Sequence, residues 1–178
     1  MGLKLSCHLP IRGKVILTAY ERGVLDALMR AVSYDAARWW AQYLGHQIAQ
    51  VTSENLIVTS GKELVAKMLM DESGYDTGLT YCAIGTGSIT PLASDTTLTT
   101  EVERKAITLK SRSSNEVTYS TYFLASEATY NIQEVGLFGH STATATPDSG
   151  VLFNHALLAY DNSSGAVDLT IDVIITFG

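Results

Sequence analysis

Threonine is distributed very unevenly along this chain of 178 residues, and this asymmetry separates two kinds of predicted structure. Residues 1–75 contain three Thr, whereas residues 76–178 contain seventeen. β-branched residues favour the pleated surface of a sheet over a helix. The second part of the chain is therefore predicted to be β structure, and helices are expected only in the first part.

Short apolar segments separated by turn residues run through the second part, as in antiparallel sheets. In the last segment, over residues 167–173, apolar and polar residues alternate strictly, which predicts one buried face and one wet face. We expect an antiparallel β-sandwich-like domain over residues 78–178. Its predicted strands cover residues 81–84, 104–112, 116–124, 132–138, 151–158 and 167–177, with a loop over residues 88–100.

The first part, residues 1–77, is predicted to be a strand-and-helix region, so that the chain as a whole is of the α+β class. Residues 14–20 form a strand candidate. Residues 24–51 carry apolar side chains at the i, i+3, i+4 spacing of an amphipathic helix, which Ser33 or Gly45 could break.

Two further features of the first part concern its helices. Trp39 and Trp40 are adjacent, so their rings point about 100° apart on a helix. Packing in the core is expected for both rings, and for Trp40 a contact with another subunit is an equally good prediction. Ser60 and Glu63 have the spacing of a capping box, which predicts the start of a second helix.

Charge is distributed as unevenly as threonine. The net charge is −6, and after Arg112 there are seven acidic residues and no Lys or Arg. Binding of nucleic acid through a broad basic face is excluded, because neutralising phosphates needs clustered cations. The acidic part predicts either a solvated face or a docking surface for a partner of opposite charge.

Other features of the sequence bear on its compartment. The two cysteines, Cys7 and Cys82, could pair, but free thiols in a reducing compartment are the expectation. Residues 1–10 lack the pattern of a signal peptide, and apolar runs fall far short of the ~20 residues of a membrane span. We expect a soluble protein made in the cytoplasm, without membrane insertion.

Gly85 and Gly87 follow a predicted strand in the tripeptide Gly-Thr-Gly, as in some phosphate-binding loops. A P-loop would close with Lys and Ser or Thr, and a dinucleotide fingerprint needs a third Gly that opens a helix. Pro91 and Leu92 follow instead. A tight turn in which Gly adopts positive φ is therefore favoured over a nucleotide site.

No other pattern points to catalysis. Glu101 and Glu103 could share one face of a strand, but the neighbouring Arg104 and Lys105 favour a surface charge cluster over a glycosidase pair. The four histidines lack the spacing of a zinc site. We therefore expect no catalytic, cofactor-binding or metal-binding residues, and no enzyme activity.

Several motifs resemble a pattern common in bacteriophage tail proteins. Residues 81–105 resemble a hydrophobic-GTG-x-x-x-P segment followed by DT-x-L and E-V-x-R, and residues 131–138 resemble an I-x-E-x-G-L-F strand. Residues 151–156 resemble the apolar strand that often follows and reads LLARA. The motif residues are Gly85, Gly87, Asp95, Glu101, Arg104, Glu134, Gly136, Leu137 and Phe138.

This resemblance implies a structural component of the phage tail, such as a tail-fibre, collar or baseplate protein. Proteins of that kind are non-enzymatic parts of the virion, made in the host bacterial cytoplasm. They act in virion assembly, join other tail proteins to fibres, and are homo-oligomers, often trimers or larger rings. Residues 24–51 depart from the expected pattern, where a short hairpin would be typical, and could form a private assembly interface.

Candidate contact residues follow from exposure and loop length, because long loops in compact domains are usually functional or braced by a partner. They are Trp39, Trp40, Ile89, Pro91 and Leu92. Gly136 is expected to allow a bulge or a close approach, and Phe138 to fill the core.

Two rival functions are weaker. One is a receptor- or carbohydrate-binding module at a fibre tip, which would use exposed aromatic residues around a concave site. The candidates for that role are Tyr119, Tyr122, Tyr130 and Tyr160. The other is a tail-associated depolymerase or peptidoglycan hydrolase, for which no acid–base pair is recognisable.

Overall fold

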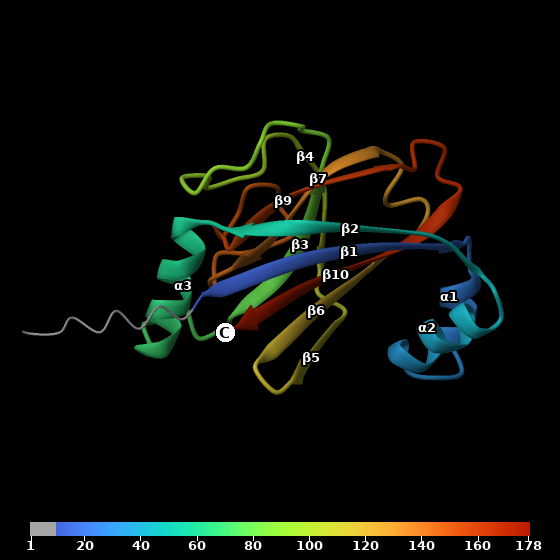
Figure 1. Cartoon of the computed structure of the whole chain (residues 1–178), viewed down its shortest axis with the longest axis horizontal. Helices are drawn as coiled ribbons and strands as arrows, with labels where there is room; N and C mark the ends of the chain where they lie inside the picture. Colours follow the sequence, from blue (N-terminus) through green and yellow to red (C-terminus); the bar gives the residue numbers. More distant parts are fainter. Residues whose placement is uncertain (1–9) are drawn as a thin grey trace, which may run out of the picture.

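The computed structural model describes residues 10–178 and is mainly antiparallel β structure in one curled sheet with helices packed around it (Figure 1). The strands are β1 (Ile11–Glu21), β2 (Gln47–Ile57), β3 (Leu79–Gly85), β4 (Glu101–Ala106), β5 (Leu109–Ser113), β6 (Glu116–Phe123), β7 (Asn131–Gly139), β8 (Val151–Leu152), β9 (Asn154–Asp161) and β10 (Val167–Phe177). The helices are α1 (Val24–Met29), α2 (Tyr34–Tyr43) and α3 (Thr59–Leu69). The sheet order is β4-β3-β7-β9-β2-β1-β10-β6-β5, and β8 pairs with β7.

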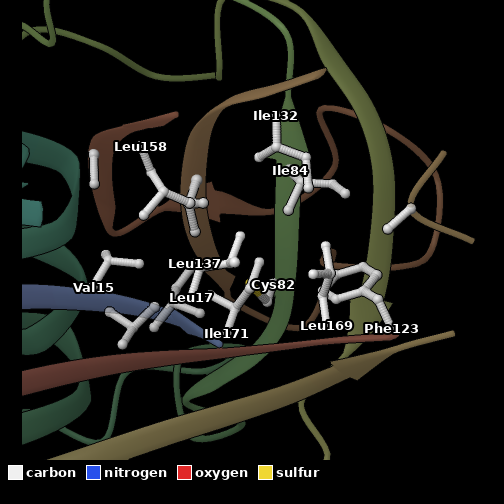
Figure 2. Close-up of a cluster of buried hydrophobic side chains, with 14 of the residues drawn as sticks. Val15, Leu17, Cys82, Ile84, Phe123, Ile132, Leu137, Leu158, Leu169 and Ile171 are labelled. Carbon is white, nitrogen blue, oxygen red and sulfur yellow. The ribbon is translucent and has the colours of Figure 1, made fainter. Parts of the chain in front are cut away.

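The two ends of this sheet meet because β4 and β5 follow one another along the chain. Between them, the amide of Ile107 donates to Thr80 O in β3, and the amide of Thr108 donates to Ser120 O in β6. The sheet therefore curls around one core. Figure 2 shows Leu17 and Ile171 close to Leu137 and Cys82, which come from the other half of the sheet. The expectation of mainly antiparallel β structure after the first helices is confirmed. The strands form a single curled sheet, and the expected α+β sandwich is not confirmed.

The N-terminal strands belong to the same sheet as the rest. β1 pairs with β10 along its whole length, from Ile11 opposite Phe177 to Glu21 opposite Val167, and β2 lies on its other side. The predicted boundary between residues 1–77 and 78–178 thus does not divide the sheet. β1 belongs to the same sheet as the C-terminal strands because its backbone groups are satisfied by pairing with both β10 and β2.

The helical prediction for residues 24–51 is correct only in part. The segment forms two helices, α1 and α2, and residues 47–51 belong to β2. Gly45, with φ of +82°, lies in the turn that ends α2. Helix α2 packs on the sheet through Ala37 and Ala41, because small side chains allow close approach to the large buried rings beneath them.

The outer face of β10 is dry, contrary to the prediction of a wet face. Helices α1 and α2 cover it, and its carboxylates are hydrogen-bonded inside. Asp172 accepts two hydrogen bonds from the Arg38 guanidinium and one from the Ser120 hydroxyl. Asp168 accepts bonds from the Tyr122 hydroxyl and from the amides of Gly23 and Ala125. Asp168 and Asp172 thus connect β10 to the helical layer through Gly23 and Arg38.

The predicted capping box at the start of α3 is wrong. Val58 occupies the N-cap position, and no side chain caps the helix. The Ser60 hydroxyl instead donates to Leu152 O at 2.8 Å, which ties the helix to β8, while Glu63 is exposed. A tertiary contact has replaced the local one.

Candidate functional site

The loop over residues 86–100 lies on the outer face of β3 and β7, opposite the main core. In this outer layer Leu98 packs with Phe138, Ala83 and Leu152, all of them buried. Residues from the two ends of the loop contact Glu134 of β7, which is more than 30 positions away in the sequence. Residues of the two motifs therefore act together to attach this loop to the sheet.

Glu134 fastens this loop to the sheet. Its buried carboxylate accepts hydrogen bonds from three loop amides, those of Gly87 at 3.0 Å, Thr99 at 2.9 Å and Thr100 at 2.7 Å. A fourth bond joins it to Nε2 of His155 at 2.9 Å. Both ends of the loop are thus tied to one side chain of β7.

The second ring nitrogen of His155 reaches the middle of the loop. Nδ1 lies 2.8 Å from Asp95 Oδ2, and the same carboxylate oxygen accepts the amide of Leu92. His155 is 1% exposed and has a carboxylate on each nitrogen. The chain Glu134–His155–Asp95 therefore spans the loop from its ends to its tip.

Gly85 and Gly87 make room for the Glu134 carboxylate. Neither has positive φ, so the predicted tight turn with left-handed glycines is wrong. A Cβ on Gly87 would lie 2.5 Å from Glu134 Oε1, and one on Gly85 would overlap the same oxygen. Gly136 similarly allows close approach, because a Cβ there would lie 2.8 Å from Asn154 O and 3.0 Å from Leu98.

A second buried carboxylate fastens a neighbouring loop. Glu101 accepts two hydrogen bonds from the Arg104 guanidinium, at 2.6 and 2.7 Å, and both side chains are buried. Arg104 also donates to Ser149 O at 2.6 Å, and its guanidinium lies 3.8 Å from the centre of the Phe138 ring. The pair therefore ties the loop over residues 140–150 to β4, and the predicted surface charge cluster is wrong for Glu101 and Arg104.

The protonation state of the His155 network follows from its contacts. Burial alone would lower the pKa of His155, but its hydrogen bonds with Glu134 and Asp95 outweigh burial and raise the pKa above the ordinary 6.5. Burial alone would raise the pKa of Glu134, but its bonds from His155 and the loop amides outweigh burial and lower it. The folded protein thus favours imidazolium between carboxylates.

We expect the free energy of unfolding to fall as the pH rises above about 6.5, because His155 loses its proton first in the unfolded chain. The stabilisation is complete below the unfolded pKa and is lost as the pH passes through the raised folded pKa. Urea unfolding between pH 6 and 9 measures this slope. In His155→Gln the slope should flatten over that window, whereas a slope equal to that of the parent would contradict the assignment.

The candidate contact residues occupy two separate places. Ile89 and Leu92 are exposed on the loop over residues 86–100, and Pro91 between them is half-buried. Trp39 and Trp40 lie on α2, at the far end of the β1–β2 hairpin in Figure 1. Both indoles are exposed, 56% and 41%, so the expectation that one or both would pack in the core is wrong.

A groove opens beside the loop where β2 and β9 part. The two strands pair only at Leu56 with His155 and at Ile57 with Asn154. Beyond these pairs lie two adjoining hollows of about 430 and 400 Å³. Ser53 and Leu157 line both hollows, and Ser88 and Pro91 of the loop lie on their rims. We call this feature the β2–β9 groove.

Metal and thiol chemistry find little support in the described range. Within residues 10–178 no group of three or more His, Cys, Asp or Glu side chains is placed to hold a metal ion. Cys82 is buried in the core, and burial raises the pKa of its thiol to about 12. Cys7 lies outside the described residues. Over the same range, the helices are too short or too polar to cross a membrane.

Sequence reasoning missed His155, which is central to the loop network. The available signal was the resemblance of residues 151–156 to an LLARA strand, which would align His155 with a basic residue. A basic side chain there, together with the acidic motif residues Asp95 and Glu134, would have indicated a buried ion pair. Comparisons with protein-family models, with curated proteins and with solved structures gave no match.

Proposed function

We propose that this chain is a non-enzymatic structural subunit of a bacteriophage tail, a tail-fibre, collar or baseplate component that joins neighbouring tail proteins to a fibre and acts in virion assembly. The proposal starts from the motif resemblance. Its main support is the Glu134 network, because the motif residues meet there to hold one long loop against the sheet.

The loop over residues 86–100 has the properties of a surface that contacts another protein. Its exposed residues include Ile89 and Leu92, which are 63% and 59% exposed. The Leu92 amide donates to Asp95, and the two ends of the loop are tied to Glu134. Exposed apolar side chains on a preorganised backbone bind a partner at a lower cost in conformational entropy. The partners in this proposal are other tail proteins and further copies of the same chain.

The absence of catalysis is part of the proposal. His155 is the strongest candidate for a general base near the loop, yet both of its ring nitrogens are hydrogen-bonded to carboxylates. A general base needs a nitrogen within reach of the substrate proton. Here the histidine serves as a structural cation.

The proposal is tested on phage particles from a bacterial strain that encodes the chain. We expect mass spectrometry of gradient-purified particles to detect the protein, and immunogold labelling to place it on the tail. Capsid-only particles from a tail-assembly mutant are the control and should lack it. Absence from purified complete particles would refute the proposal.

A receptor- or carbohydrate-binding module is the alternative, and one observation favours it. The Trp39 and Tyr43 rings are stacked at 5.2 Å between centroids with planes 7° apart, and both are exposed. Of the tyrosines considered from the sequence, Tyr122 is buried and the others are half-buried. Binding of host-surface polysaccharide that Trp39→Ala abolishes would favour this alternative over the tail-joining role.

A further inference from the structure

In the part of the chain that the structure describes, residues 10–178, the β2–β9 groove leaves two strand edges without backbone partners. Over residues 47–55, β2 pairs with β1 on one side and, among the described residues, with no strand on the other. Over residues 157–161, β9 pairs with β7 but not with β2. An open strand edge is a template for another strand, because its amides and carbonyls are ready to pair.

The groove also opens toward the main core. Val51 packs against that core, and both Val51 and Leu157 line the groove and are only half-buried. Apolar side chains at the base of an open cleft gain from being covered, since apolar surface is then removed from water. The occupant that satisfies both the backbone edge and the apolar base is an extended polypeptide strand.

The same chain carries one strand suited to this place. β5 is the last strand on the sheet path, and within residues 10–178 it pairs only with β6. Its residues from Lys110 to Ser113 are all exposed. In contrast, β4 at the other end of the path is partly covered, with Arg104 buried beneath the loop over residues 140–150.

Charge favours pairing between these two surfaces. Lys110 and Arg112, the last Lys and the last Arg of the sequence, are two positions apart and so project from one face of β5. Glu54 and Asp161 are exposed on the two groove strands, and Asp95 lies on the loop above. Lys14 stands opposite Glu54 on β1, but β9 and the loop over residues 86–100 contain no Lys or Arg.

We infer that β5 of one copy pairs with the free edge of β2 in the groove of the next copy. This inference deepens the homo-oligomer expected under the proposed function and names its interface. Donor and acceptor are different surfaces, so the contact is head to tail. Repetition of such a contact gives a closed ring if the rotation between successive copies adds up to a full turn without a shift along the axis, and a filament otherwise.

The first test is the molar mass of the purified chain, measured by light scattering on a sizing column. The parent protein should form a discrete multimer, and Lys110→Glu with Arg112→Glu should reduce it to the monomer. Adding Glu54→Lys and Asp161→Lys to that variant should restore the multimer. Arg30→Glu with Lys62→Glu, which reverses two exposed charges elsewhere, is the control and should leave the multimer intact.

Hydrogen exchange gives a second readout that does not depend on variants. The amides of residues 48–55 and 109–113 should exchange more slowly in the multimer than after dilution to the monomer. A parent chain that is monomeric at all concentrations would overturn the inference. So would a multimer that survives reversal of the β5 charges, or that dissociates only on Trp39→Ala with Trp40→Ala. None of these results bears on whether the chain is present in the phage tail.

Discussion

Replacing Glu134 with alanine should cost about 3–5 kcal/mol of the free energy of unfolding, a large share of what a domain of this size has. Three loop amides and the buried His155 ring lose their acceptor together. A buried donor left without a partner costs roughly 1–3 kcal/mol. Urea unfolding at pH 7 measures the loss, and limited proteolysis within residues 86–100 reports whether the loop detaches before the sheet unfolds.

Two further variants serve as comparisons, one at the same position and one at an exposed glutamate. Glu134→Gln keeps the size of the side chain and one acceptor oxygen, so its loss should be smaller than that of Glu134→Ala. Glu63→Gln changes an exposed glutamate of α3 and should shift the stability by no more than about 0.5 kcal/mol. If Glu134→Ala behaved like Glu63→Gln and the loop stayed resistant to protease, the network would not be what holds the loop.

Most strand positions could be predicted from the sequence because they depend on local patterns. One exception is the segment over residues 104–112, which was predicted as one strand and is observed as β4 (Glu101–Ala106) and β5 (Leu109–Ser113). The final strand was predicted over residues 167–177 and is observed as Val167–Phe177, and residues 116–124 correspond closely to Glu116–Phe123. β-branched residues and period-two alternation are carried by each strand on its own. The way in which strands are ordered in the sheet depends on contacts between distant segments, and the expected sandwich is not confirmed.

The helical layer shows why burial is harder to predict than periodicity. On α2 the buried positions are Ala37 and Ala41, so a rule that places the largest apolar residues in the core selects the wrong face. The sheet beneath the helix already supplies large rings in Tyr20 and Tyr122. Once this layer is in place, Asp172 can be buried, because Arg38 of the helix neutralises it.

The residues of the candidate site could be predicted from the sequence, but the contacts between them could not. The motif includes Gly85, Gly87 and Glu134, and these residues do meet. Their relation depends on an absent Cβ beside a carboxylate from another strand, which no local rule for glycine describes. His155 was missed for the same reason, since its two partners lie 21 and 60 positions away in the sequence.

Arg104 should be the second most sensitive side chain of the outer layer. Arg104→Met leaves the Glu101 carboxylate buried without its partner, and breaking a buried ion pair from one side costs about 3–5 kcal/mol. The bond to Ser149 O is lost with it, so the loop over residues 140–150 should become more sensitive to protease. Urea unfolding of the variant gives the size of the loss.

A neighbour on the same strand provides the matched control. Lys105 pairs with Glu127, but about a third of each side chain is exposed, so Lys105→Met should cost about 1 kcal/mol or less. Combining Arg104→Met with Glu101→Met should recover much of the loss, because two apolar side chains replace a buried pair without leaving a charge behind. A double variant no more stable than Arg104→Met would show that the contacts with Ser149 and Phe138, and not the ion pair, carry the stability of this layer.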